Sequence, residues 1–313
     1  MRILALLLVI VGLCLLFPGS QRAQRSTPGR SDSGMDGRSN LSSDSRGTSL
    51  FAQSTGQTLH RDFPSDDISF LLIDIPSGEV LASRWDHPEI PIAMGSLVKP
   101  FTALAYGEGH DFRYPVHICR GASTGCWHPR GHGKMDLTSA IAQSCNSYFR
   151  MLTAQMTAAE MTPFAARFGL QPPSKENSGP ALAGLSNHVA ADPGPDHGSD
   201  TAWLIAPLNM ARAYRELIRS RYDRGVRLVL DGMAQSARQG TAADVDRALL
   251  NSVALAKTGT APCIHARHAP GDGFTVVLFP AGHPTVLLLV RVHGVPGSQA
   301  AGIAGRMLRS IEP

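Results

Sequence analysis

The chain has 313 residues, of which 43% are hydrophobic and 17% are charged. These proportions are ordinary for a globular protein and exclude a wholly disordered one. The formal net charge is +4, but five of the arginines lie in a polar stretch between residues 22 and 46. The sequence therefore indicates no basic face, and no nucleic acid is expected as a partner.

An uncharged apolar run over residues 3–17 follows Arg2 directly. It resembles the apolar part of a secretory signal and is short for a membrane span. Residues 1–23 are interpreted either as a signal peptide, with weak cleavage sites after Ser20 or Ala23, or as an uncleaved N-terminal membrane anchor. Both alternatives predict an extracytoplasmic protein, in the periplasm or at the outer face of the cytoplasmic membrane.

Residues 24–60 are rich in Ser, Gly and Arg and show no apolar periodicity, so we expect a disordered linker there. Residues 61–313 then form the folded domain. Runs of β-branched and apolar residues predict strands at 68–75, 79–84, 253–260, 274–279 and 285–292. Helical periodicity predicts helices at 96–107, 137–155, 158–168, 201–219 and 298–311, and Pro and Gly predict a loop at 172–199. This order predicts an α+β fold, with an antiparallel sheet flanked by helices and an all-helical lobe.

A Ser-x-x-Lys motif, Ser96 to Lys99, opens the first of these helices. The three-residue spacing puts both side chains on one helix face, within reach of proton transfer. A serine hydroxyl becomes a good nucleophile when a base removes its proton, and a buried lysine beside a second cation is neutral enough to be that base. We therefore predict Ser96 as a nucleophile and Lys99 as its base.

A second motif, Ser144-Cys145-Asn146, interrupts the predicted helix at 137–155. Ser and Asn are poor residues for a helix interior and offer a hydroxyl and an amide to a cleft. Ser144 is expected to relay a proton to a leaving amine. Asn146 is expected to hold a substrate amide.

A third motif, Lys257-Thr258-Gly259-Thr260, ends a predicted strand. Lys257 with Thr258 or Thr260 is expected to receive a substrate carboxylate, and Gly259 to let the substrate backbone lie close. The backbone N–H groups of Ser96 and Thr260 are the expected oxyanion hole.

In this order, the three motifs resemble those of penicillin-binding proteins and serine β-lactamases. The resemblance covers residues 68 to 312 and includes the segments IDIPSGEVLAS, IPIAMGSLVKPFTALAY, GHGKMDLTSAIAQSCNSYF and QGTAADVDRALLNSVALAKTGTA. It looks closest to the transpeptidase domain of high-molecular-weight class B enzymes. The chain departs from that pattern in lacking a large N-terminal pedestal domain, and Ala256 stands where many members have glycine.

The resemblance implies a β-lactamase/transpeptidase-like fold and a D,D-transpeptidase that acts on the D-Ala-D-Ala end of peptidoglycan stem peptides. β-Lactams would be its inhibitors, and a cell-wall synthesis complex with a shape-and-division glycosyltransferase its setting. A D,D-carboxypeptidase and a non-enzymatic β-lactam or muropeptide sensor remain alternatives. A β-lactamase is disfavoured because no glutamate is placed as a dedicated deacylation base.

Four cysteines follow the apolar leader, and an even number in an exported protein is typical of disulfides. Cys119 and Cys126 are close enough in sequence to form one. The set Cys119, Cys126, His132 and Cys145 alternatively supplies four ligands of the kind found in closed tetrahedral zinc sites. The sequence leaves a structural zinc and a Cys119–Cys126 disulfide open, and no cofactor is expected for catalysis.

Overall fold

The computed structural model describes residues 42–171, 179–185, 202–263 and 271–312. The predicted signal or anchor at residues 1–23 and most of the expected loop at 172–199 lie outside this part. Among the described helices, none is both long and apolar enough to cross a membrane.

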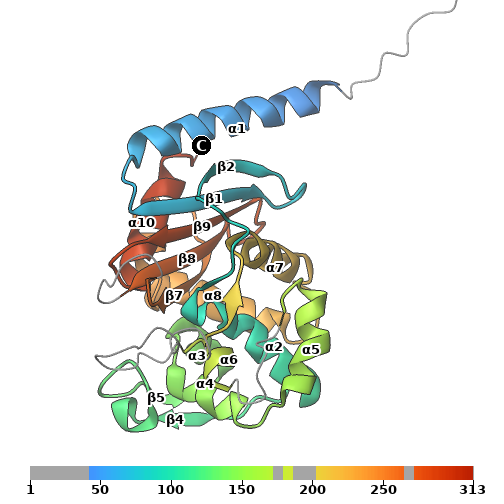
Figure 1. Ribbon diagram of the computed structural model, residues 1–313, viewed down its shortest axis with the longest axis vertical. Helices are drawn as coiled ribbons and strands as arrows, with labels where there is room; N and C mark the ends of the chain where they lie inside the picture. The colour runs from blue at the N-terminus through green and yellow to red at the C-terminus, as the bar shows by residue number, and fades with distance from the viewer. Residues whose placement is uncertain (1–41, 172–178, 186–201, 264–270, 313) are drawn as a thin grey trace, which may run out of the picture. The chain divides into compact units, whose positions relative to one another are not determined.

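The centre of the domain is a five-stranded antiparallel sheet with the order β2-β1-β9-β8-β7 (Figure 1). Its strands are β1 (Ile68–Asp74), β2 (Val80–Arg84), β7 (Leu255–Ala261), β8 (Asp272–Phe279) and β9 (Val286–Val292). The first two strands are joined by a short turn and the last three follow one another in the chain. The predicted antiparallel sheet and all five of its strands are therefore confirmed.

Helices cover both faces of this sheet. One face packs against α1 (Ser42–Asp62), α9 (Ala243–Ala248), α10 (Gly297–Arg309) and the end of α8 (Val226–Gln239) at Ala237, while the other buried apolar side chains of α8 belong to the opposite core. The other face packs against α7 (Pro207–Arg219) and the helical lobe, whose helices are α2 (Lys99–Gly109), α3 (Leu137–Ala142), α4 (Asn146–Thr153), α5 (Ala158–Arg167) and α6 (Gly179–Leu182). Alternate side chains of β1, β7, β8 and β9 enter the two cores, as the twofold strand period requires.

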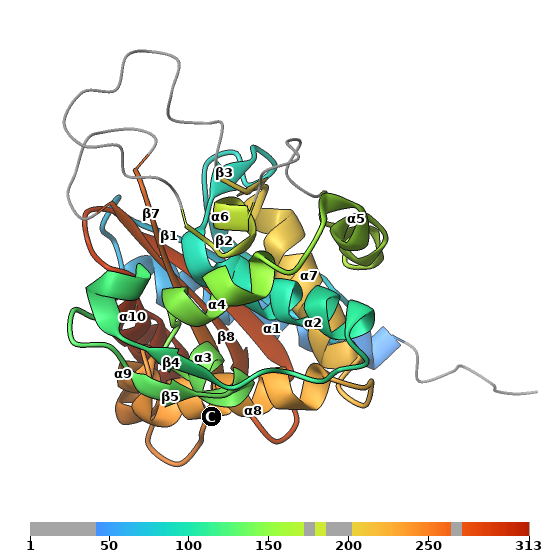
Figure 2. The same ribbon diagram turned by 90° about the horizontal axis from the view of Figure 1, so that it is seen from below.

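Six short elements accompany the helices of the lobe. The 3-10 turn η1 (Gly95–Val98) precedes α2, and η2 (Gly121–Thr124) lies between the paired strands β4 (His117–Cys119) and β5 (Gly133–Met135). Strands β3 (Ile92–Ala93) and β6 (Leu204–Ile205) form a second small pair. Viewed from below, the lobe and the β4–β5 pair lie in front of the large sheet (Figure 2).

Two expectations differ from the structure. Residues 42–60, expected to belong to a disordered linker, form most of α1, because Leu59 is fully buried against the sheet and gives this polar helix a tertiary anchor. The helix predicted from residue 201 begins only at Pro207, which occupies its first position. Leu204 and Ile205 instead pair with β3.

Candidate active site

Ser96 lies in η1, immediately before α2, with its side chain partly exposed while the neighbouring Leu97 and Val98 are buried. The turn packs closely against β7. Gly95 has φ +55°, and a Cβ atom at this position would collide with the carbonyl oxygen of Thr260. Only glycine meets both requirements, so the sequence Gly95-Ser96 fixes the serine beside the third motif.

Lys99 is fully buried one turn after Ser96, at the start of α2. Its Nζ atom donates to Asn146 Oδ1 at 2.6 Å and to the carbonyl oxygen of Ser144 at 2.7 Å, and lies 3.4 Å from Ser144 Oγ. Burial lowers the pKa of Lys99 to about 7. A substantial fraction of the amine is therefore neutral at pH 7, as a general base requires.

The second motif forms the junction between α3 and α4. Ser144 has φ +49°, which is uncommon for a residue with a side chain, and Asn146 is the first residue of α4. The unusual backbone holds the Ser144 hydroxyl between the two motif lysines, 2.8 Å from Lys257 Nζ. The predicted interruption of the helix is confirmed, and it serves to aim this hydroxyl.

Lys257, on β7, is also fully buried and donates to the carbonyl oxygen of Thr258 at 2.7 Å. Burial, together with the charge of Lys99, lowers the pKa of Lys257 well below its usual value. The two threonines of the motif are held separately. Thr258 Oγ1 donates to Thr241 Oγ1 at 2.6 Å, and Thr260 Oγ1 accepts from the N–H of Gly297 at 3.0 Å.

Gly259 has a packing role that the sequence did not reveal. A Cβ atom here would collide with the carbonyl oxygen of Met94 and lie 3.2 Å from the Leu97 side chain. The absence of a side chain therefore lets η1 approach β7. The expected role of Gly259 beside the substrate remains a prediction.

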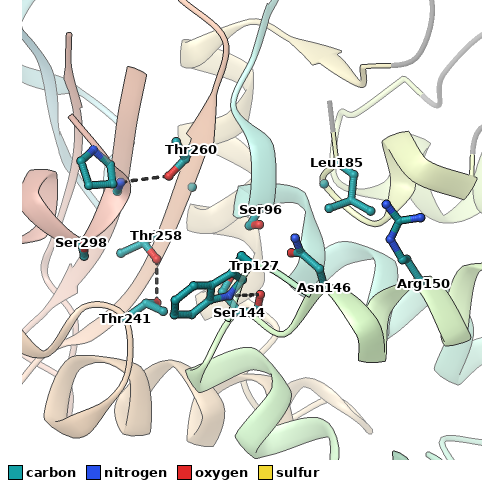
Figure 3. A pocket seen from close by; sticks show the side chains of 14 residues that line it. Ser96, Trp127, Ser144, Asn146, Arg150, Leu185, Thr241, Thr258, Thr260 and Ser298 are labelled. Carbon is teal, nitrogen blue, oxygen red and sulfur yellow. Dashed lines mark hydrogen bonds between the residues drawn. The ribbon is translucent and has the colours of Figure 1, made fainter. Parts of the chain in front are cut away.

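A cleft of about 600 Å³ opens above these residues (Figure 3). Ser96, Ser144, Asn146, Thr258, Gly259 and Thr260 all line it. The structure thus brings six members of the three motifs together around the cleft, while Lys99 and Lys257 lie buried beneath Ser144. None of the described lining residues is acidic, and one of them, Arg150, carries a positive charge, so the cleft favours an anionic ligand.

Eight further lining residues were not predicted from the sequence: Trp127, Arg150, Gly184, Leu185, Thr241, Pro296, Gly297 and Ser298. Trp127 is 51% exposed and its Nε1 atom donates to the carbonyl oxygens of Gln143 and Ser144, both at 3.2 Å. Arg150 follows Asn146 by four residues on α4, and this spacing was a usable signal because it places both on one helix face. Nothing in the local sequence marks Thr241 or Ser298.

The predicted ligand set Cys119, Cys126, His132 and Cys145 is brought together behind the second motif. All four ligand atoms lie within 4.8 Å of one another. His132 Nδ1 is 3.6 Å from Cys119 Sγ and 3.5 Å from Cys126 Sγ, and the sulfur atoms of Cys126 and Cys145 are 3.9 Å apart. Cys119 and Cys126 carry free thiols, so the structure does not contain the alternative disulfide.

The fold and cleft define a class of protein: a domain in which Ser-x-x-Lys, Ser-x-Asn and Lys-Thr-Gly motifs meet at one cleft beside an antiparallel sheet. The sequence model of the penicillin binding protein transpeptidase domain matches residues 68–311. The chain belongs to this family, whose members bind penicillin. No curated protein matches the chain.

Solved structures share the fold at low sequence identity. PBP2 of Pseudomonas aeruginosa has a TM-score of 0.64 and 16% identity, over 82% of this chain and 76% of that one. The transpeptidase domain of penicillin-binding protein 3 from Burkholderia pseudomallei has a TM-score of 0.59 and 17% identity, over 85% and 92%. A D,D-transpeptidase domain from Eggerthella lenta has a TM-score of 0.63 and 17% identity, over 82% and 80%. These neighbours agree with the resemblance to class B enzymes.

Proposed function

We propose that the chain is a D,D-transpeptidase that acts on the D-Ala-D-Ala ends of peptidoglycan stem peptides through an acyl-enzyme on Ser96. The observation that carries this proposal is the meeting of Ser96, Lys99, Ser144, Asn146 and Lys257 at one anion-favouring cleft. An acyl donor ending in a free carboxylate suits this charge distribution. Family membership supports the same class of reaction.

In the proposed first step, neutral Lys99 removes the Ser96 proton and Oγ attacks the carbonyl carbon of the penultimate D-Ala. The N–H groups of Ser96 and Thr260 stabilise the oxyanion. As the C–N bond breaks, Ser144 passes a proton from the lysine side to the departing D-Ala amine. Thr258 and Thr260, with the amine of Lys257 beneath them, receive the terminal carboxylate, and Asn146 binds the donor amide.

In the second step, an amine of another stem peptide attacks the ester and releases Ser96. Water in place of the amine would make the enzyme a carboxypeptidase. Because no described lining residue is acidic, the cleft offers no carboxylate to activate that water, which favours the amine. The same observation disfavours rapid hydrolysis of a bound β-lactam.

Labelling with a fluorescent penicillin tests the proposal. The wild type should become covalently labelled, Ser96→Ala should not, and Ser83→Ala, which alters an exposed serine on β2, should label like the wild type. Absence of label in the folded wild type would overturn the acyltransferase assignment.

Incubation with a D-Ala-D-Ala stem peptide and an amine acceptor then separates the activities. A cross-linked product supports a transpeptidase, and a free tetrapeptide supports a carboxypeptidase. Labelling by penicillin without release of D-Ala supports a sensor.

The proposed activity places the domain outside the cytoplasm, where the stem peptides are. A cell-wall synthesis complex is the proposed setting. Two solved neighbours are a peptidoglycan synthase complex, with a TM-score of 0.58, and a complex of PBP2 with MreC from Helicobacter pylori, with a TM-score of 0.62. Those assemblies support the proposal by analogy of fold.

We propose also that Cys119, Cys126, His132 and Cys145 hold a structural zinc. Bonds of about 2.3 Å to sulfur and about 2.0–2.1 Å to nitrogen, at tetrahedral angles, separate two sulfur ligands by about 3.8 Å and sulfur from nitrogen by about 3.5 Å. The observed 3.9, 3.6 and 3.5 Å fit this geometry. The ion would tie the β4–β5 loop, which carries Trp127, to the junction at Cys145.

Elemental analysis with thiol counting tests this site. Cys126→Ser should bind one equivalent of zinc less than the wild type and should label more slowly with penicillin. A wild type without zinc, in which two of these thiols are lost to a bridge, would contradict the metal and restore the disulfide alternative.

A further inference from the structure

A second group of possible metal ligands lies at the end of the large sheet, away from the cluster at Cys145. It consists of Cys263, two residues after β7, Asp272, the first residue of β8, and His293, the residue after β9. The strand pairing places Asp272 opposite Ala261 and Gly273 opposite Val292. Three consecutive strands therefore bring these three side chains to one point, although the residues are distant in the sequence.

The distances converge on one atom. His293 Nδ1 lies 2.9 Å from Asp272 Oδ1 and 3.7 Å from Cys263 Sγ, and the three ligand atoms lie within 4.8 Å of one another. A nucleophile, imidazole and carboxylate that act as a proton relay use both ring nitrogens. Here thiol and carboxylate face the same nitrogen, so the arrangement does not match a relay.

The same distances suit ligands of one ion. Bonds of about 2.0–2.3 Å that meet at angles between about 90° and 110° separate the ligand atoms by about 2.9–3.8 Å. Asp272 is 2% exposed, so its carboxylate needs a partner, and the His293 side chain is only 20% exposed. An Asp–His hydrogen bond would satisfy these two residues but gives the thiol no role.

We propose that Cys263, Asp272 and His293 form a binding site for a zinc-like divalent cation. Thiolate and imidazole ligands select zinc over magnesium or calcium, which prefer oxygen alone. One thiolate and one carboxylate balance the two positive charges. Three ligands come from the described residues, and open zinc sites combine three protein ligands with a water molecule.

The site would act on the wall of the cleft that recognises the substrate carboxylate. Cys263 follows Thr260 by three residues, and His293 precedes Pro296 and Gly297, both of which line the cleft. Gly297 donates to Thr260 Oγ1. A bound metal would therefore link the segment after β7 to the segment after β9, and both segments position Thr260.

Metal titration of the full chain, first stripped with a chelator, tests the site. Zn²⁺ stoichiometry and the thiolate-to-metal charge-transfer band of Co²⁺ are measured for the wild type, Cys263→Ser and His293→Gln. Each variant should bind one equivalent less than the wild type, and Cys263→Ser should lose part of the band. The matched control is His283→Gln, which alters an exposed histidine between β8 and β9 and should match the wild type.

Equal stoichiometry and affinity in the wild type and Cys263→Ser would overturn the proposal. The measured quantity is the difference in bound metal between the wild type and Cys263→Ser. Metal held by Cys119, Cys126, His132 and Cys145 contributes equally to both proteins and therefore cancels. The readout also needs no penicillin or stem peptide. If the proposed acyltransferase activity were refuted, the result for this metal site would still stand. If this metal site were refuted, the proposed acyltransferase activity would still stand.

Discussion

The two walls of the cleft are held in place by different means. The sheet wall comprises η1, β7 and the start of α10, and its segments touch backbone to backbone at Gly95, Gly259 and Gly297, where any Cβ atom would collide. The helix wall comprises the Ser144–Asn146 junction and Trp127, and it is fixed by buried side chains, chiefly Lys99 and Lys257. The difference implies that changes in the sheet wall disturb folding and catalysis together, whereas changes in the helix wall can disturb catalysis alone.

Lys99→Met should give the largest effect on the rate of penicillin labelling. It tests whether a change in the helix wall can disturb catalysis without disturbing folding. The variant keeps an unbranched buried side chain but removes the base, so the rate of penicillin labelling should fall by about 10²–10⁴-fold. Lys257→Met should weaken carboxylate recognition and slow the same step less. Labelling of Lys99→Met at the wild-type rate would refute the role of Lys99 as base.

Gly259→Ala tests the sheet wall. Because the added methyl would meet the carbonyl oxygen of Met94, η1 must move away from β7, and overpacking of this kind destabilises by about 1–3 kcal/mol. Thermal melting should show a lower Tm, and labelling should slow because Ser96 moves with η1. Gly282→Ala is the matched control: a Cβ there has no atom within 4 Å and should change stability by less than about 0.5 kcal/mol. Equal melting of the two variants would contradict the proposed packing role.

Ser144→Gly and Ser144→Ala separate the backbone of the helix wall from its chemistry. Both remove the hydroxyl that lies between the lysines, so both should label slowly. Glycine adopts φ +49° without steric cost, whereas alanine costs about 1 kcal/mol or slightly more. Denaturant unfolding should therefore find Ser144→Gly the more stable of the pair. The opposite order would mean that the positive φ is not a source of strain.

The sequence was informative where short motifs or strand patterns carry the structure. Alternating and apolar runs identified all five strands of the large sheet. Ser144 and Lys257 were each tied to the correct local element, whereas Ser96, expected to open a helix, lies in the 3-10 turn just before it. The proposed metal set was also found by residue type alone, and the structure brings Cys119, Cys126, His132 and Cys145 together.

The sequence was less informative where tertiary contacts decide. The helix α1 has a polar sequence, and its burial at Leu59 depends on a sheet that is formed by residues downstream. Thr241 enters the site only because the chain between α8 and α9 reaches Thr258. The steric need for Gly259 depends on the backbone of Met94, 165 positions earlier by residue number, which no local pattern encodes.

The smallest expected effect is a shift in the pH dependence of penicillin labelling. It tests the role of Lys99 in the helix wall. In the proposed mechanism Lys99 acts as a base when neutral, and burial lowers its pKa to about 7, so the acylation rate should rise as the pH increases through about 7 and then level off. The positive charge of Arg150 contributes to lowering this pKa. Arg150→Gln should therefore raise the pKa of Lys99 and move the midpoint to higher pH by a fraction of a unit, since an exposed charge is well screened. Arg130→Gln removes an exposed charge from the β4–β5 loop and should leave the midpoint in place. A midpoint that moves to lower pH in Arg150→Gln, or that is absent between pH 5 and 9 in the wild type, would show that the rate does not follow the protonation of Lys99.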